Sequence, residues 1–473
     1  MSEIKVNKLT PRVACGTTTL GDSGDTFNIP AGVTISNNGT ATGFGATGAV
    51  NWDVASIKTV DFTAVSGVGY FVDTATTGAV IVTLPAAPAV GDVVGVSDYA
   101  NNFNTAECTL NRNSLKIGGV ADNATLTVNG VAVTLVYVDV TKGWIVTDSG
   151  NQSDAPGPGF VAATGGCITT SGDYKIHTFF SPGTLVVSNG GNSAGSNTVD
   201  YMVVAGGGGG GGHGGGGGGA GGYRESPGTA SGSYTVSPRG AAPAVALPVS
   251  ATPYAIVVGG GGPGGCNSGG TKGTDSSFST ITSTGGGYGG GGIPSPTTVG
   301  GPGGSAGGGG GGPGCSIPGG TGNDPPTNPA QGTGGGNFAQ PVYAGGGGGG
   351  AICAGTNASP GGPAGPGGIG AGTAINLTTM PAPSPTPSAQ IGTPGPTPSV
   401  RYFAGGGGGS IQPPNSNNGT GGAGGGGTGV HTPTPPMNAT INTGGGAGGG
   451  HAGPPGLGGT GGSGIVVIRY KYQ

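Results

Sequence analysis

The stretch Tyr201-Met202-Val203-Val204-Ala205, followed by seven glycines (206–212), His213 and six more glycines (214–219), decides the fold of this chain. Similar short aromatic or apolar leads precede later glycine runs at residues 254–258, 342–344 and 401–404. The chain after about residue 200 is therefore organised around a repeated unit, in which an apolar lead is followed by a glycine tract.

Glycine runs of this kind have three physical outcomes. They form flexible linkers when nothing holds them in place. Collagen requires glycine at strictly every third position, which unbroken runs do not provide. The third outcome is a left-handed helix with three residues per turn, packed among similar helices whose carbonyl groups accept its N–H groups. Glycine suits such packing because it has no Cβ and lets backbones approach closely.

Ordering these tracts is costly, because glycine loses more backbone freedom on folding than any other residue. Many tracts in succession, several with an apolar lead, favour a cooperative hydrogen-bonded array over a tether. The sequence therefore predicts an all-β N-terminal region followed by a C-terminal array of packed left-handed polyglycine helices of the polyproline-II type, with little or no α-helix.

Composition and charge restrict the partners of the chain. Of its 473 residues 121 are Gly and 39 are Pro, and the net charge is −4. The only acidic residues after residue 200 are Glu225, Asp275 and Asp324, whereas disordered tails usually carry high charge. There is no basic stripe to hold phosphates, which argues against nucleic acid. The six cysteines form no C-x-x-C pair, so we expect no metal and no cofactor.

The N-terminal half divides into β-rich segments. Residues 1–50 contain very short strands, which are more stable when several chains wind together, and so indicate an oligomerisation segment. Residues 51–150 predict a sandwich-like β-domain, with an Asn129-Gly130 hairpin joining residues 125–128 to residues 131–138. Residues 151–160 are interpreted as a linker.

The C-terminal half begins with a β-rich cap at residues 161–200, and residues 201–473 form the glycine-rich domain. The final apolar strand, residues 465–470, is expected to pair with this cap and to close the domain. Loops rich in Pro, Thr, Ser and Asn separate the tracts, and proline stiffens such loops. Irregular loops on a rigid scaffold are the usual form of a recognition surface. Deletion of the longest one, residues 374–400, is expected to leave the array folded and to reduce binding.

Several phrases of the sequence together resemble tail-fibre proteins of marine and cyanobacterial bacteriophages. They are Ile4-Lys5-Val6-Asn7-Lys8-Leu9, Ile29-Pro30-Ala31-Gly32, Ile57-Lys58-Thr59-Val60-Asp61-Phe62, Gly172-Asp173-Tyr174-Lys175-Ile176-His177, Val199-Asp200-Tyr201-Met202-Val203-Val204 and Gly464-Ile465-Val466-Val467-Ile468-Arg469-Tyr470. The resemblance covers essentially the whole chain. It implies a sandwich of polyglycine helices whose loops at the far end contact the host receptor, but no individual contact residue, because those loops vary.

The resemblance implies a structural virion component, a tail fibre or adhesin. Its partners would be itself as a homo-oligomer, expected to be a trimer, other virion tail proteins through residues 1–50, and a bacterial surface receptor that is an outer-membrane protein or a polysaccharide. Such a protein is assembled in the host cytoplasm and becomes extracellular on lysis, which agrees with the lack of a signal peptide and of a membrane-spanning run.

Candidate receptor contacts are residues of the loops and tract leads. They are Tyr343, Met380, Arg401, Tyr402, Phe403 and His431. The aromatic residues among them directly precede tracts, so they are either packing anchors at a tract end or, if that end is the exposed tip, binding hot spots. His213 and His451 are interpreted as residues of a turn or a tract end.

No arrangement of Ser, His and an acid suggests catalysis in a domain with so few acids, so we expect no enzymatic activity. Two other functions stay open. One is a purely structural fibre or filament subunit without receptor binding. The other is an ice-binding protein, since flat polyglycine arrays can order water, although the concentration of Thr in irregular loops counts against it.

Overall fold

The structure is a computed structural model that describes residues 50–148, 158–292, 299–311, 316–341, 343–381, 384–385, 389–413, 416–432, 437–451, 453 and 456–473. The expected oligomerisation segment, residues 1–50, lies outside the described residues except for Val50. Most of the expected linker also lies outside them. The β-domain and the glycine-rich domain are therefore described separately.

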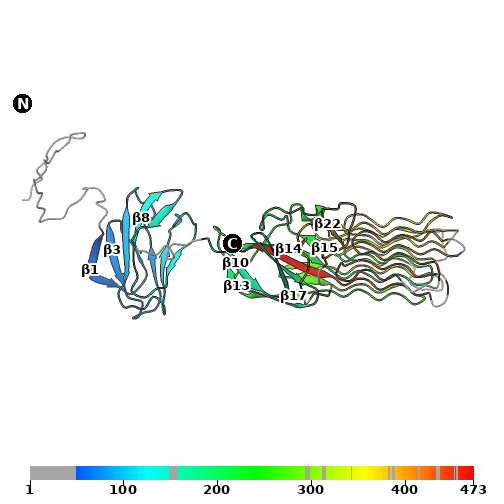
Figure 1. Cartoon of the computed structure of the whole chain (residues 1–473), viewed down its shortest axis with the longest axis horizontal. Coiled ribbons are helices and arrows are strands. Elements are labelled where there is room, and N and C mark those ends of the chain that lie inside the picture. Colours follow the sequence, from blue (N-terminus) through cyan, green and yellow to red (C-terminus); the bar gives the residue numbers. More distant parts are fainter. Residues whose placement is uncertain are drawn as a thin grey trace, which may run out of the picture. The chain divides into compact units, whose positions relative to one another are not determined.

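The β-domain of residues 50–148 consists of two sheets (Figure 1). Its strands are β1 Asn51–Lys58, β2 Phe62–Thr63, β3 Val68–Val72, β4 Val80–Thr83, β5 Val93–Asp98, β6 Cys108–Asn111, β7 Ala124–Leu126, β8 Ala132–Asp139 and β9 Gly143–Val146. One sheet has the order β1-β3-β5-β8-β9 and the other β2-β4-β6-β7. Successive strands up to β6 alternate between the sheets and pair in parallel within each sheet.

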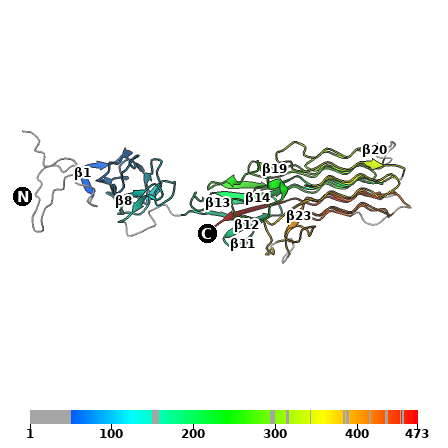
Figure 2. The same cartoon turned by 90° about the horizontal axis from the view of Figure 1, so that it is seen from above.

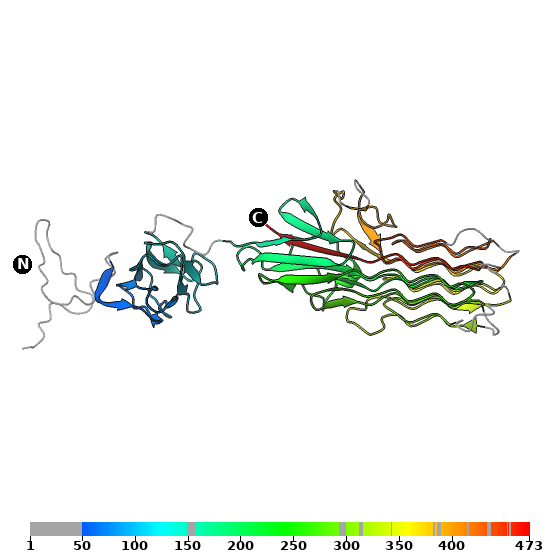
Figure 3. The ribbon, with the colours of Figure 1, turned by 90° about the horizontal axis from the view of Figure 1, so that it is seen from below.

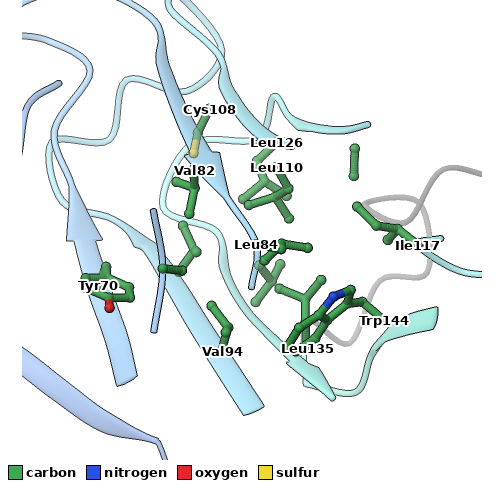
Figure 4. Close-up of a cluster of buried hydrophobic side chains, with 14 of the residues drawn as sticks. Tyr70, Val82, Leu84, Val94, Cys108, Leu110, Ile117, Leu126, Leu135 and Trp144 are labelled. Atoms are coloured by element: carbon green, nitrogen blue, oxygen red, sulfur yellow. The ribbon is translucent and has the colours of Figure 1, made fainter. Parts of the chain in front are cut away.

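Apolar side chains from both sheets meet in one core, part of which is drawn in Figure 4. Val82 and Leu110 come from one sheet and Leu135 and Trp144 from the other, and all of them are fully buried. Every second residue of β4 and β8 faces this core, which is the period of a half-buried strand.

The predicted hairpin at Asn129-Gly130 is wrong. Strand β7 pairs with β6, whereas β8 pairs with β5 and β9, so the two flanking strands belong to different sheets. Two hydrogen bonds to residues outside the turn hold it: the backbone amide of Gly130 donates to Asp98 Oδ2 (3.0 Å), and the side-chain Oδ1 of Asn129 accepts from the backbone amide of Asn104 (2.9 Å). The turn therefore carries the chain from one sheet to the other.

The glycine-rich domain begins with two sheets. Its strands are β10 Val161–Thr164, β11 Cys167–Ser171, β12 Tyr174–Phe179, β13 Gly183–Gly190, β14 Thr198–Val204, β15 Tyr223–Glu225, β16 Leu247–Pro248, β17 Pro253–Val257, β18 Ser276–Phe278, β19 Ile281–Ser283, β20 Ser316–Ile317, β21 Phe338–Ala339, β22 Ala371–Thr373, β23 Arg401–Phe403 and β24 Ile465–Lys471, and a short 3₁₀ helix, η2, spans Pro238–Gly240. One sheet has the order β11-β12-β24-β14-β15, with β16 on β14, and the other β10-β13-β17-β18-β19.

Strand β24, red in Figure 1, lies between β12 and β14 and is antiparallel to both. The prediction that the last strand pairs with the cap at residues 161–200 is therefore confirmed, and β12 is the strand of the cap beside it. Val203 of β14, Phe278 of β18 and Ile468 of β24 are buried in one cluster contributed by both sheets. Residues 161–200 are thus part of the same core as the glycine-rich domain.

The glycine tracts are bonded to one another by their backbones in a pattern with a period of three residues. The amides of Gly207 and Gly210 donate to Gly462 and Gly459, at 2.9 and 3.0 Å. The next residues along the tract donate in two other directions. Gly208 and Gly211 donate to Gly219 and Gly216, and Gly209 and Gly212 donate to Thr271 and Ser268. Each third residue of the tract therefore faces the same neighbour.

Tract 206–212 also accepts hydrogen bonds from three further tracts. Gly262 and Gly265 donate to its carbonyl groups from one side, Gly286 and Gly289 from a second, and Ala447 and Gly450 from a third. Added Cβ atoms would meet these neighbours at 1.9 to 2.1 Å for residues 206–211, against carbonyl oxygens. A tract enclosed in this way has no position that accepts a side chain, which explains its unbroken glycine.

Tracts at the surface carry side chains at every third position. In tract 363–370 the exposed residues are Pro363, Pro366 and Ile369, while the glycines between them face the array. The same spacing places Leu457 and Thr460 on the surface of the last tract. A side chain at every third position thus indicates a tract at the surface, whereas unbroken glycine indicates an enclosed tract.

The tracts run side by side, from the sheets to turns at the opposite end (Figures 2 and 3). We call the end that joins β14, β15 and β24 the sheet end, and the end that carries β20 and the turn at His213 the far end. No α-helix occurs among the described residues, which confirms the predicted all-β class with little or no α-helix.

Candidate functional site

Loops from separate tracts meet at the far end. Ala344 forms β-bridges with both Ala339 and Ile411, and the amide of Gln412 donates to the carbonyl of Tyr343 (3.1 Å). The loop at residues 338–344 therefore lies directly beside the loop that begins at Ile411. These contacts assemble a continuous surface from segments far apart in the sequence.

Tyr343 is the predicted contact residue at the centre of this surface. Its side chain is half-buried, and its ring centroid lies 6.1 Å from that of Phe338, which is fully buried. Phe338 thus supports one side of Tyr343 while part of the phenol stays accessible. A rigid, partly exposed aromatic ring of this kind suits a recognition surface.

His431 continues the same surface. Its side chain is half-buried, and its Nδ1 lies 2.7 Å from the amide nitrogen of Asn418, which belongs to the neighbouring loop. The amide of Val430 also donates to the carbonyl of Gly449 (3.0 Å), which ties this segment to the next tract. Two of the six predicted contact residues, Tyr343 and His431, therefore lie at the far end.

The other four lie at the sheet end, around β23. Phe403 and Met380 are 1% and 2% exposed and belong to one apolar cluster that also contains residues of β14 and β24. Side chains buried in this way are unavailable to a partner. The structure therefore favours the first of the two roles considered for Phe403, an anchor at the end of a tract.

Arg401 and Tyr402 hold the long loop at residues 374–400. The guanidinium of Arg401 donates from Nε to the carbonyl of Ile391 (3.1 Å) and from Nη2 to that of Gly392 (2.7 Å), and desolvation lowers the pKa of Arg401. Tyr402 is 8% exposed, and its hydroxyl accepts a hydrogen bond from the amide of Thr397 (3.3 Å).

The described part of residues 374–400 is therefore anchored to the sheet end, although many of its residues stay exposed. Ile375 and Ile391 are buried in the same cluster as Phe403. The buried guanidinium of Arg469 donates to the carbonyl of Ile375 (3.1 Å), which attaches the loop to β24. Sequence composition missed this because a few apolar residues among many Pro, Thr and Ser are enough to bury a loop.

A cavity of about 620 Å³ opens at the sheet end. It lies between the turn from β12 to β13 and residues Ile441 and Asn442, and Phe180 lines one wall. Ile441 is 59% exposed beside it. None of its lining residues is charged, and its polar side chains are the hydroxyl groups of Thr178, Ser181 and Thr184 and the amide of Asn442.

Glu225 of β15 is fully buried at the sheet end without a cation. Its Oε2 accepts from the hydroxyl of Tyr223 (2.8 Å) and the amide of Ser237 (3.0 Å), and its Oε1 accepts from the hydroxyl of Thr373 (2.5 Å). Desolvation raises the pKa of Glu225 to about 7, although the hydrogen bonds from Ser237, Thr373 and Tyr223 oppose this shift. The carboxyl group therefore links β15 to β22, and with a pKa of about 7 it is partly protonated at neutral pH.

Replacement of Glu225 by Gln is expected to change how stability depends on pH. The unfolded carboxyl group ionises near pH 4.5 and the folded one near pH 7. The contribution of Glu225 to the free energy of unfolding is therefore fully present below pH 4.5 and is lost as the pH rises through about 7. This loss is about 3 kcal/mol. Denaturant titrations between pH 4.5 and 8 should show Glu225→Gln gaining that amount relative to wild type. Parallel profiles for the two proteins would contradict this assignment.

No group of three or more His, Cys, Asp or Glu side chains in the described part of the chain is arranged to hold a metal ion. A search of the same residues for a helix long and apolar enough to cross a membrane found none. Sequence reasoning did miss one arrangement: the segments that carry His213 and His431 are both hydrogen-bonded to the backbone just before His451 at the far end. No local signal relates them, because hydrogen bonds between distant tracts bring them together.

Comparison with known proteins identifies the domain. A family model described as a glycine-rich domain matches residues 186–471, which include β14, all the tracts and β24. No curated protein sequence matches the chain. The match covers more than half of the chain, and the chain belongs to the glycine-rich domain family.

Proposed function

We propose that the tracts are left-handed polyglycine helices with three residues per turn. The three directions in which the amides of tract 206–212 donate support this geometry, as do the exposed side chains at every third position of tract 363–370. None of the glycines 206–212 has φ in the left-handed region, which agrees with the negative φ of the polyproline-II conformation.

We infer that the chain is a tail-fibre adhesin of a bacteriophage that binds a bacterial surface receptor through its far-end loops. The observation that carries this proposal is the continuous surface formed by the loops around Tyr343, Ile411 and His431 on a hydrogen-bonded base. Loop composition can change there without disturbing the tracts, because the loops only connect tract ends. Such a surface suits many weak contacts repeated on several copies, so that avidity exceeds the affinity of one site.

The rest of the chain then has a supporting role. We propose that residues 1–50 attach the protein to other virion tail proteins and join copies into a homo-oligomer, expected to be a trimer. Assembly would take place in the host cytoplasm, and the far-end loops would meet a receptor only after lysis. These parts of the proposal rest on the resemblance to phage tail fibres.

Replacement of Tyr343 by Ala is expected to weaken binding to a host strain by roughly tenfold or more, since an aromatic hot spot contributes at least about 1.4 kcal/mol. The change in unfolding free energy should stay below about 2 kcal/mol, because the ring is only half-buried. The measurement is saturation binding of the labelled full-length protein to a panel of aquatic bacteria.

Ile441→Ser is the matched control, because Ile441 is an exposed apolar residue beside the sheet-end cavity. If only the Ile441 variant loses binding, the receptor site is that cavity and the far-end assignment fails. If no strain is bound, although the panel includes a host, the structural fibre becomes the better proposal. Thermal hysteresis of the same protein would instead support ice binding.

A further inference from the structure

Three histidines from three loops come together at the far end. The residue after His213 donates from its amide to the carbonyl of the residue before His451 (2.8 Å). The residue before His431 donates to the carbonyl two residues before His451 (3.0 Å). His451 therefore lies between the segments that carry His213 and His431.

All three imidazoles are half-buried, so each can reach a ligand from the surface. Of these three histidines, only His431 forms a side-chain hydrogen bond within the described part of the chain, and its partner is the side-chain amide of Asn418. That amide donates to Nδ1 of a neutral imidazole, and when His431 is protonated the amide must turn so that its oxygen accepts instead. Three half-buried imidazoles are therefore carried by neighbouring segments of one surface.

The surroundings of the cluster carry no permanent charge. The sequence of the tracts and far-end segments that carry or adjoin these histidines, at residues 206–222, 266–269, 285–292, 405–432 and 444–458, contains no Asp, Glu, Lys or Arg. The other titratable side chains of these segments and of the neighbouring far-end loop are Cys266, Tyr288 and Tyr343, and neither a thiol nor a phenol becomes positively charged. Protonation of the histidines therefore converts a neutral tip into a cationic one.

We propose that His213, His431 and His451 form an acid-activated site for anionic groups, and that its ligand is an acidic surface polysaccharide. This inference rests on the proposed function, because it assigns the ligand chemistry of the far-end loops. Burial and the charges of His213 and His431 lower the pKa of His451, so the free cluster resists full protonation. A bound carboxylate, sulfate or phosphate offsets that repulsion, so anion binding and proton uptake strengthen each other.

The test measures binding of the full chain to polygalacturonate, dextran sulfate and uncharged dextran at pH 5.5 and pH 8, at constant ionic strength. We expect binding to at least one polyanion to be roughly tenfold tighter at pH 5.5, since each histidine that gains a proton on binding adds up to a factor of ten per pH unit. Uncharged dextran should not bind at either pH. The carboxylated and sulfated arms distinguish uronate ligands from sulfate or phosphate ligands.

The variant His213→Gly removes one imidazole without straining the backbone, because His213 has φ of 54° and glycine adopts this conformation freely. Together with His431→Gln and His451→Gln it should abolish the difference between the two pH values. Glu225→Gln is the matched control, since Glu225 titrates in the same range but is buried at the sheet end, and it should keep the difference.

An unchanged ratio of affinities in the triple variant, or equal affinity at both pH values in the wild type, would overturn the inference. Cell binding by the same proteins separates it from the proposed function. Strain-specific binding without a histidine-dependent pH effect refutes the anion site and leaves the adhesin proposal intact. A histidine-dependent effect on polyanions, with no binding to any strain at either pH, supports the site and refutes the adhesin proposal.

Discussion

Replacement of Gly208 by Ala should prevent the glycine-rich domain from folding. An added Cβ would lie 2.1 Å from the carbonyl oxygen of Gly287, a distance that no unstrained contact allows. The backbone cannot move away, because Gly208 donates to Gly219 and Gly219 donates in turn to Gly287, each at 2.8 Å. One methyl group therefore forces apart tracts that are bonded on every side.

Gly260→Ala provides the matched control, since it adds the same methyl group to an outer tract. The nearest atom to its Cβ would be the hydroxyl oxygen of Thr274, at 3.9 Å. There alanine should be tolerated and should stabilise the domain by about 0.4–1 kcal/mol, by reducing the freedom of the unfolded chain. Thermal unfolding and amide hydrogen exchange should show a folded domain for Gly260→Ala and none for Gly208→Ala. Equal stability of the two would show that the tracts are not enclosed.

Replacement of Phe403 by Ala is expected to cost about 3–5 kcal/mol of unfolding free energy, because it empties a fully buried aromatic site. The ring fills the space between the tract that follows it and the loop containing Met380 and Ile391. Its loss should free that loop and shorten the lifetime of the hydrogen bonds between β22 and β23.

Tyr343→Ala supplies the comparison, because Tyr343 also precedes a tract but lies at the far end. Phe403→Ala should lower the denaturation midpoint strongly and, below that midpoint, should leave receptor binding unchanged. Tyr343→Ala should do the reverse. If Phe403→Ala reduced binding while its stability matched that of wild type, Phe403 would be a contact residue after all.

Much of the fold could be predicted from the sequence, because the places where glycine runs are unbroken indicate which tracts are enclosed by others. Unbroken glycine at residues 206–212 indicates an enclosed tract, and the apolar pattern of the C-terminal strand indicated that it pairs with the cap at residues 161–200. The Asn129-Gly130 hairpin failed because the local turn signal does not record which sheet each flanking strand joins. Asp98 and Asn104, which hold that turn, come from another part of the β-domain.

The candidate site was harder to predict, because the sequence does not give the direction in which each tract runs. Tyr343 and Phe403 both stand before glycine tracts, yet one begins a tract at the far end and the other at the sheet end. Local sequence cannot distinguish them. The meeting of His213, His431 and His451 likewise depends on hydrogen bonds between tracts, which leave no trace in spacing.

The three-residue period of the backbone hydrogen bonds limits how such a gene can lengthen or shorten its tracts. Every third amide of a tract donates to the same neighbouring tract. One inserted residue would therefore direct each later amide to a different tract from the one that accepts its hydrogen bond now. Three inserted residues keep the direction of each amide and, in the left-handed helix proposed above, add one turn or about 9 Å of length. Within tracts, viable insertions and deletions should therefore come in multiples of three residues, whereas the far-end loops can change length one residue at a time.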